Sequence, residues 1–304
     1  MTRRSSLSGV FVVTVTPFAQ DCALDEAETR RLVSLMASEG ADGIVVAGST
    51  GEWFALSEAE RIRLFEIVAD ESRGRLKLIA GVSAIVTGEA VRLAEAARSL
   101  GYDGGLLLPP PYILPARAEL FAFVAAVDAA GLPIMLYNNP GRTGVNLDGP
   151  LLSELLRFPR VVALKESAKD LQQIARTIRM VGEEIAIFSG MENYLLPTVQ
   201  RGAVGVVAMA PNVLGASAME LFRAISRGDL AAANRLQGPV DRLYDEMYAG
   251  HTNPYVVLKE GMRLRGRPGG HPRPPLLPMA RVDLEAFRRV LDEIDPARAA
   301  AAAE

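Results

Sequence analysis

Residues 161–167 read VVALKES, four apolar residues followed by a lysine, a glutamate and a serine. A parallel strand that is covered on both faces is usually a continuous apolar run, so this segment is predicted to be a buried strand with Lys165 at its C-terminal end. The chain has only four lysines, Lys77, Lys165, Lys169 and Lys259, and Lys165 alone ends an apolar strand pattern. Lys165 is therefore the first candidate for chemistry that needs an amine.

Short apolar runs alternate with longer helical patterns on both sides of this strand, from Gly9 to about Gly228. The spacing of roughly 20–30 residues per pair is typical of βα units. Eight such units in succession predict an α/β protein with a closed (β/α)8 barrel, the TIM barrel. The predicted strands are residues 10–15, 43–47, 76–80, 104–108, 132–137, 161–165, 185–189 and 204–208.

The pattern changes after the eighth unit. Helical patterns follow at 230–249, 254–264 and 283–294, and a segment rich in glycine and proline separates the last two. No ninth strand follows, so these helices are expected to pack outside the barrel. The predicted organisation is a catalytic barrel, residues 1–228, with a C-terminal helical extension, residues 229–304.

Composition narrows the class of partner. The chain has 304 residues and a net charge of −3, so it has no basic field for nucleic acid, and a small-molecule partner is expected. One cysteine excludes an internal disulfide, and the two histidines, His251 and His271, lack ligand spacing, so no protein-built zinc site is expected. Apolar runs stay shorter than a membrane span, and a secretory leader pattern is absent. These features favour a cytoplasmic protein that does not bind membranes.

Polar residues follow several of the predicted strands. In a parallel barrel the C-terminal ends of all strands lie on one rim, so these residues are expected to form one constellation. The candidates are Ser49 and Thr50 after the second strand, Tyr112 after the fourth, Tyr137 and Arg142 at the fifth, Lys165 at the sixth, Gly190 after the seventh and Val207 in the eighth.

The expected chemistry centres on Lys165. Burial disfavours an ammonium group and so favours the neutral, nucleophilic amine. Such an amine condenses with a ketone to an imine, a Schiff base, which makes the neighbouring carbon acidic without any cofactor. An ordinary ion pair between Lys165 and Glu166 at the strand end is the alternative, and the sequence leaves both open.

The other polar candidates have side chains that suit the steps of the same imine chemistry. The Tyr137 phenol suits the proton transfers of imine formation, and Arg142 suits a substrate carboxylate, which it can bind through two parallel hydrogen bonds. The hydroxyls of Ser49 and Thr50 can hold a second carboxylate or relay a proton. Each also has an ordinary structural role: an aromatic strand end for Tyr137, a solvated loop cation for Arg142, and turn formation or helix capping for the hydroxyls.

Three segments together resemble a known family, the Schiff-base aldolases related to dihydrodipicolinate synthase and N-acetylneuraminate lyase. They are GSTGE at 48–52, YNNPGRTG at 137–144 and LKES at 164–167, the last followed by Asp170. The resemblance implies that Lys165 forms an imine with pyruvate or another 2-oxo acid and that Tyr137 is the acid and base. It implies that Ser49 and Thr50 hold the substrate carboxylate.

The same resemblance implies an assembly. In this family the tyrosine at the position of Tyr112 reaches into the site of a neighbouring subunit, and the threonine at the position of Thr50 links it to the tyrosine at Tyr137. A homodimer, commonly paired into a homotetramer, is therefore expected.

The substrate is expected to be a 2-oxo acid, with two candidate reactions. Arg142 followed by Thr143-Gly144 resembles the branch that condenses pyruvate with aspartate semialdehyde, the 4-hydroxy-tetrahydrodipicolinate synthases. Ser49, Trp53 and Met191 depart from that branch and favour an aldolase or dehydratase of 2-oxo-3-deoxy sugar acids, or a related deaminase, that uses the same imine. Ile85 stands where lysine-inhibited synthases have asparagine, so lysine inhibition is not expected. A non-catalytic barrel that binds 2-oxo acids is the alternative outside enzymology.

Overall fold

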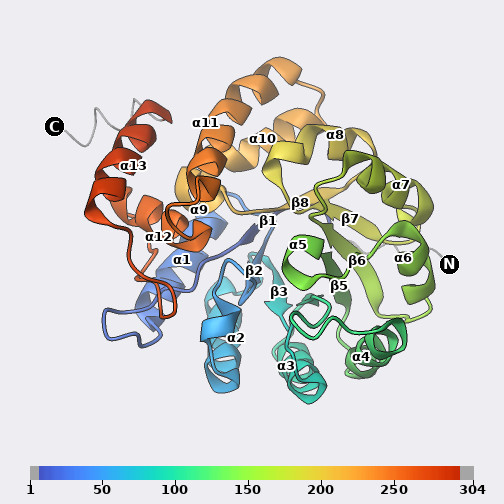
Figure 1. Ribbon diagram of the computed structural model, residues 1–304. Helices are drawn as coiled ribbons and strands as arrows, with labels where there is room; N and C mark the ends of the chain where they lie inside the picture. The colour runs from blue at the N-terminus through green and yellow to red at the C-terminus, as the bar shows by residue number, and fades with distance from the viewer. Residues whose placement is uncertain (1–6, 295–304) are drawn as a thin grey trace.

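The computed structural model describes residues 7–294 and contains eight parallel strands closed into a barrel, with helices around it (Figure 1). Each strand pairs with the next in the sequence, and β8 pairs with β1. The predicted (β/α)8 fold is confirmed. The strands are β1 Gly9–Val13, β2 Gly43–Val46, β3 Lys77–Gly81, β4 Gly104–Leu107, β5 Ile134–Asn138, β6 Val161–Glu166, β7 Ala186–Ser189 and β8 Gly205–Ala208.

The helices of the barrel include short turns that the periodicity did not reveal. These short elements, η1, α5, η2 and α9, all lie in loops that follow strands. In order, the elements are α1 Glu26–Ser38, η1 Trp53–Ala55, α2 Glu58–Ser72, α3 Thr87–Ser99, α4 Arg117–Ala129, α5 Pro140–Thr143, α6 Gly149–Leu155, α7 Leu171–Val181, η2 Glu192–Tyr194, α8 Leu195–Gln200, α9 Pro211–Leu214 and α10 Ala216–Ser226.

Three further helices follow the barrel: α11 Leu230–Tyr248, α12 Pro254–Leu264 and α13 Arg281–Ile294. They lie together on one side of the ring, where α11 packs on α10 and α12 packs on α9 (Figure 1). Within residues 7–294, no helix is both long and apolar enough to cross a lipid bilayer.

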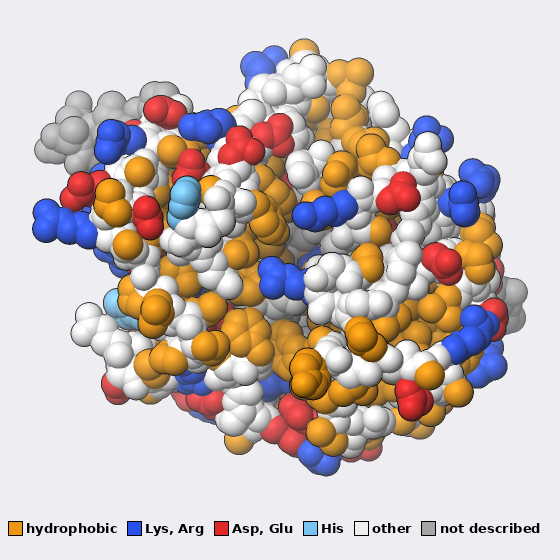
Figure 2. Space-filling model, in the orientation of Figure 1, with side chains coloured by type: hydrophobic (Ala, Val, Ile, Leu, Met, Phe, Trp, Pro, Cys, Tyr) orange, Lys and Arg blue, Asp and Glu red, His pale blue; other side chains and the backbone are white. Residues whose placement is uncertain are grey.

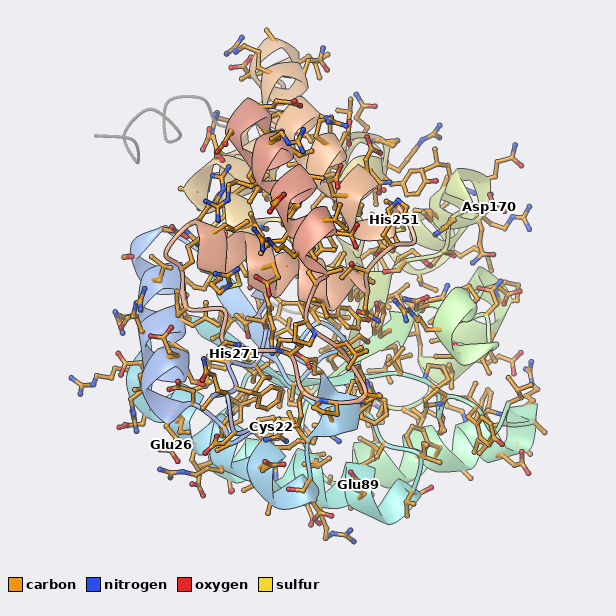
Figure 3. All side chains as sticks on the ribbon, turned by 60° about the vertical axis from the view of Figure 1, so that its left-hand side comes forward. Cys22, Glu26, Glu89, Asp170, His251 and His271 are labelled. Atoms are coloured by element: carbon orange, nitrogen blue, oxygen red, sulfur yellow. The ribbon has the colours of Figure 1, made fainter. Side chains whose placement is uncertain are left out.

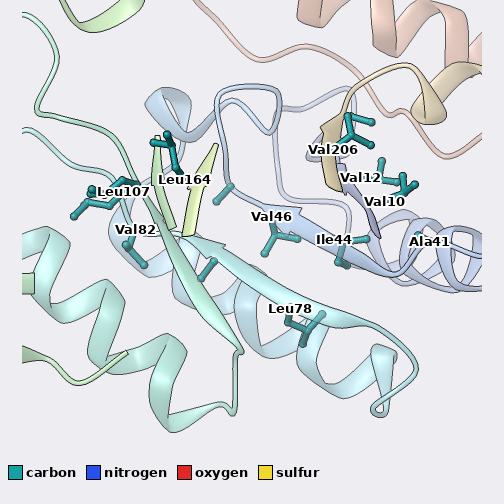
Figure 4. Packing of buried hydrophobic residues seen from close by; sticks show 14 of the residues in the cluster. Val10, Val12, Ala41, Ile44, Val46, Leu78, Val82, Leu107, Leu164 and Val206 are labelled. Carbon is teal, nitrogen blue, oxygen red and sulfur yellow. The ribbon is translucent and has the colours of Figure 1, made fainter. Parts of the chain in front are cut away.

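Apolar side chains form two layers because successive residues of a strand point to opposite faces. One layer fills the barrel interior, where the rings of Phe11 and Phe188 meet edge to face with centroids 5.3 Å apart. Gly43 and Gly205 make room for these rings, since a Cβ atom at either position would lie 2.4 Å from a ring carbon. The other layer joins the strands to the outer helices, and Figure 4 shows part of it.

The glycine- and proline-rich segment between α12 and α13 is tied to the barrel. The Arg267 guanidinium donates to both carboxylate oxygens of Glu39 at 2.5 and 2.6 Å, and the His271 backbone N–H donates to the Phe18 carbonyl at 2.8 Å. His271 and Cys22 consequently lie on the same side of the molecule (Figure 3). The extension is thus fastened to the first βα unit of the barrel.

Arg273, in the same segment, binds the start of α2. Ser57 and Glu60 form a capping box there, with each side chain accepting from the other's backbone N–H. The Arg273 guanidinium donates to both oxygens of Glu60, at 2.8 and 3.0 Å, and to the Ala55 carbonyl at 2.7 Å. The hydrogen bond from Arg273 lowers the pKa of Glu60 from its ordinary 4.5 to about 2.

The Glu60 shift predicts a specific loss of stability in acid. The Glu60 carboxyl has a lower pKa in the folded state than in the unfolded chain, so the unfolded chain binds this proton first as the pH falls. The stability that Glu60 contributes is therefore present above pH 4.5 and is lost as the pH falls towards about 2. Glu60→Gln is expected to cost roughly 1 kcal/mol at pH 7 and to flatten this part of the acid profile. Urea unfolding at a series of pH values measures both. An unchanged acid slope in the variant would contradict the assignment.

Candidate active site

A cavity of about 270 Å³ lies at the C-terminal ends of the strands. Figure 2 looks onto this face, which is hollowed near its centre and has basic side chains at the edge of the hollow. Six of the residues that the sequence analysis singled out line the cavity together: Ser49, Thr50, Tyr137, Arg142, Lys165 and Gly190.

Lys165 points into the barrel and is only 4% exposed. It pairs in register with Tyr137 on β5, and its Nζ atom lies 4.2 Å from the centre of the Tyr137 ring. Glu166, the next residue along the strand, points the other way and is buried outside the barrel. It accepts hydrogen bonds from Asn138 Nδ2 at 3.0 and 3.1 Å and from the Ala168 N–H at 2.7 Å. The structure therefore places the Glu166 carboxylate with these donors and leaves the Lys165 amine facing the cavity.

Glu166 is a residue whose role the sequence analysis missed. Burial raises its pKa to about 7, although the hydrogen bonds from Ala168 and Asn138 oppose the shift. Asn138 in turn accepts from the Leu147 N–H at 2.9 Å through its side-chain oxygen. Glu166 thus orients Asn138, and Asn138 holds the loop that follows β5, which carries Arg142.

Tyr137 is buried beside the amine, and its hydroxyl oxygen accepts a hydrogen bond from Asn139 Nδ2 at 3.0 Å. Burial alone would raise the pKa of Tyr137, but the positive charge of Lys165 and the hydrogen bond from Asn139 outweigh it, so the pKa is lowered. A phenol that loses its proton more readily than usual is suited to proton transfer near neutral pH.

The structure keeps two of the predicted residues out of this cavity. Tyr112 lies in the loop after β4, is 90% exposed, and has a positive φ of 74°. Its phenol is presented to the surroundings rather than to the site of its own chain. Val207 is buried in the apolar interior of the barrel, and Met209, two residues further along, lines the cavity in its place.

The C-terminal extension contributes part of the cavity wall. Tyr248 at the end of α11 and Tyr255 in α12 both line the cavity, and the Arg142 guanidinium lies 5.6 Å from the centre of the Tyr255 ring. The loops after β6 and β7 add Lys169 and Met191. The two tyrosines were not predicted, because helix periodicity does not reveal which end of the barrel a tail helix covers. Lys169 and Met191 follow strands, and the rule that strand ends share one rim could have found them.

The cavity is strongly cationic for a chain of negative net charge. Lys165, Arg142 and Lys169 all line it, and none of its lining residues is an aspartate or a glutamate. An anionic ligand is therefore expected, with more than one negative group if all three charges are to be matched.

A model of the dihydrodipicolinate synthetase family matches residues 6–294. The chain belongs to this family. It is 40% identical over 278 residues to an uncharacterised DapA-like lyase of Rhizobium meliloti, a match that covers 91% of this chain and 93% of the relative. It is 36% identical over 288 residues to the 4-hydroxy-tetrahydrodipicolinate synthase of Synechococcus sp. (strain JA-2-3B'a(2-13)), covering 94% and 93%.

Comparison with solved structures leads to the same family. YagE, a prophage protein of E. coli K12 solved in complex with pyruvate, superposes with a TM-score of 0.90 at 25% identity, over 95% of this chain and 99% of YagE. Membership of the family makes the chain a class I, pyruvate-dependent Schiff-base aldolase or lyase.

The loop that carries Ser49 and Thr50 is anchored by a buried ion pair. Glu52, at a positive φ of 54°, pairs with Lys259 of α12, and both side chains are excluded from water. Lys259 also donates to the His271 carbonyl at 2.7 Å, and burial lowers its pKa to about 8 although Glu52 opposes the shift. The pair therefore fastens this family segment, residues 48–52, to the C-terminal extension.

Tyr137→Phe is expected to lower kcat by about 10²- to 10³-fold, because the phenol supplies protons that water must then deliver. The ring remains, so the neighbourhood of Lys165 is preserved. Steady-state kinetics with the best substrate measures the loss. Tyr102→Phe is the matched control: it removes a hydroxyl that donates to the Phe65 carbonyl at 3.0 Å outside the cavity, and its kcat is expected to stay unchanged. Equal kcat values for Tyr137→Phe and wild type would exclude Tyr137 as the proton carrier.

Proposed function

We propose that this chain is a lyase whose Lys165 forms an imine with the carbonyl carbon of pyruvate or another 2-oxo acid. The observation that carries the proposal is the position of the Lys165 amine, which is almost excluded from water and lies 4.2 Å from the Tyr137 ring in a cavity without carboxylates. Attack by the neutral amine on the ketone carbon gives a carbinolamine. Tyr137 then donates a proton to the departing hydroxyl, which leaves as water.

The imine makes the next carbon acidic. Loss of a proton from that carbon gives an enamine, which attacks the carbonyl of a second substrate and forms a carbon–carbon bond, and the reverse sequence breaks such a bond. Hydrolysis of the product imine restores the Lys165 amine. No metal or organic cofactor is required in this proposal, because the protonated imine itself withdraws the electrons.

Three polar residues are assigned to substrate carboxylates. Ser49 and Thr50 would hold the carboxylate of the 2-oxo acid, and Arg142 would hold a carboxylate on the second substrate. With these assignments, condensation of pyruvate with aspartate semialdehyde, the reaction of a 4-hydroxy-tetrahydrodipicolinate synthase, is the first candidate. The identity to the Synechococcus synthase and the position of Arg142 in the cavity support it.

A second candidate is an aldolase or dehydratase of 2-oxo-3-deoxy sugar acids, or a related deaminase, acting through the same imine. Two observations favour it. The relative at 40% identity is named as a lyase and not as a synthase, and a second hollow that shares three lining residues with the cavity offers room for a longer chain. The exposed Tyr112 supports a further proposal, that the enzyme works as a homodimer or homotetramer in which this phenol enters the site of a neighbour.

Borohydride reduction tests the imine. Wild-type protein incubated with pyruvate and borohydride is expected to gain one reduced pyruvate adduct per chain, located on Lys165 by peptide mass spectrometry. Protein that stays unmodified under these conditions would support a barrel that only binds 2-oxo acids.

Turnover distinguishes the two candidate reactions. Product formation is measured with pyruvate plus aspartate semialdehyde and with a panel of 2-oxo-3-deoxy acids. Arg142→Ala is expected to lose most of the condensation activity while the pyruvate imine still forms. If Arg142→Ala blocks pyruvate trapping instead, Arg142 binds the first substrate and the assignment is wrong.

A further inference from the structure

A second hollow adjoins the active cavity. We call it the outer chamber; its volume is about 310 Å³, and it shares Lys169, Met191 and Tyr248 with the active cavity. Its remaining walls come from η2 and α11 and include Asn193, Tyr194 and Asp245. The two spaces are therefore neighbours, and the Lys169, Met191 and Tyr248 side chains border both.

Lys169 carries a charge that the described residues leave unmatched. It forms no ion pair within residues 7–294, and its Nζ atom lies 5.8 Å from the centre of the Tyr248 ring. Asp170, the next residue in the sequence, and Asp245, which lines the same chamber, have other partners. Asp170 (Figure 3) caps α7, accepting from the Gln172 and Gln173 N–H groups at 2.9 and 3.1 Å, and Asp245 lies 4.0 Å from Arg242.

Lys169 and Arg142 stand on different walls. Arg142 belongs to α5, which follows β5, and lies by Tyr255, whereas Lys169 follows β6 and lies by Tyr248. Arg142 lines the active cavity alone, whereas Lys169 lines both spaces, so Lys169 is the cation available to a ligand group in the outer chamber. The two cations are better explained by a substrate that has a negative group beyond the reach of Arg142.

We propose that the outer chamber is a subsite for the far end of a long 2-oxo acid, and that Lys169 binds a terminal carboxylate there. The inference rests on the proposed imine chemistry and adds the substrate class, a 2-oxo dicarboxylate or a condensation product that ends in a carboxylate. A neutral hydroxylated chain, bound by Asn193 and Tyr194 without help from Lys169, is the competing interpretation.

Competition at the imine tests this subsite. Linear 2-oxo acids of five to eight carbons are compared in pairs of equal length, one of each pair with a terminal carboxylate and one without. The measured quantity is the concentration of each acid that halves the trapping of pyruvate on Lys165 by borohydride. In the wild type, the longer dicarboxylates are expected to compete about five- to tenfold better than their monocarboxylate partners.

Three variants isolate the charge. Lys169→Met is expected to remove the preference for dicarboxylates and Lys169→Arg to retain it, each preference being measured as the ratio between the two members of a pair in the same variant. Lys77→Met is the matched control, because it removes a lysine at the start of β3, paired with Asp103 on the opposite end of the barrel, and should leave the preference intact.

Two results would overturn the inference. If the wild type shows no preference for a terminal carboxylate, or Lys169→Met weakens both members of each pair equally, Lys169 does not bind such a group, and normal pyruvate trapping then leaves the proposed function standing. A wild type that traps no pyruvate at all removes the proposed function and this inference with it.

Discussion

Replacing Lys165 with alanine is expected to lower turnover by at least about 10⁴-fold and to abolish borohydride trapping of pyruvate. The Lys165 amine is the group that bonds to the substrate. Among the residues that line the cavity, Lys169 has the one other primary amine that could form an imine. Steady-state kinetics and intact-protein mass spectrometry measure the two effects. The variant is expected to keep its fold, since the alanine leaves a space that opens onto the cavity.

Lys169→Ala provides the comparison for this prediction. It removes the second amine of the cavity and is expected to trap pyruvate as the wild type does. If pyruvate is still trapped in Lys165→Ala and is no longer trapped in Lys169→Ala, Lys169 is the nucleophile and the proposed chemistry is wrong.

The second large effect is expected at the Glu52–Lys259 pair. Lys259→Met leaves the Glu52 carboxylate buried without its cation, a change that typically costs about 3–5 kcal/mol of unfolding free energy. Urea unfolding measures the loss. Because residues 48–52 carry Ser49 and Thr50, KM for the 2-oxo acid is also expected to rise.

Two further variants separate charge burial from a general loss of packing. The double variant Glu52→Gln with Lys259→Met is expected to be more stable than Lys259→Met alone, because no bare carboxylate remains. Lys77→Met breaks an exposed pair with Asp103, 2.8 Å apart, and should cost at most about 1 kcal/mol. Similar losses for Lys77→Met and Lys259→Met would show that burial of the pair is unimportant.

The barrel and its reactive centre were predictable because local patterns decide them. The apolar run before Lys165 required a covered parallel strand, and period-two alternation along that strand then places Lys165 inside and Glu166 outside. The short helix α5 was missed, since four residues are too few to produce a period, and it is recognisable only by the proline at its start and by Gly144 in the left-handed conformation at its end.

Contacts between distant segments were not predictable from such patterns. Nothing in the local pattern links Glu52 to Lys259, whereas the structure pairs them across 207 positions of the chain. Tyr248 and Tyr255 belong to helices whose apolar faces predict burial without saying against what. Which tail residues reach the cavity depends on how three helices dock, and docking is decided by the whole surface.

The cavity has two walls of different origin. Lys165 and Tyr137 stand on adjacent barrel strands, which cannot shift without opening the ring, whereas Tyr248 and Tyr255 stand on helices outside it. The reaction type therefore depends on the strands, and the substrate choice depends partly on the C-terminal helices. Exchanging the last three helices between two such enzymes, together with the partner of Lys259, should change the preference for one carbon chain over another, while the bond-making step and the contributions of Arg142 and Lys169 stay as they were.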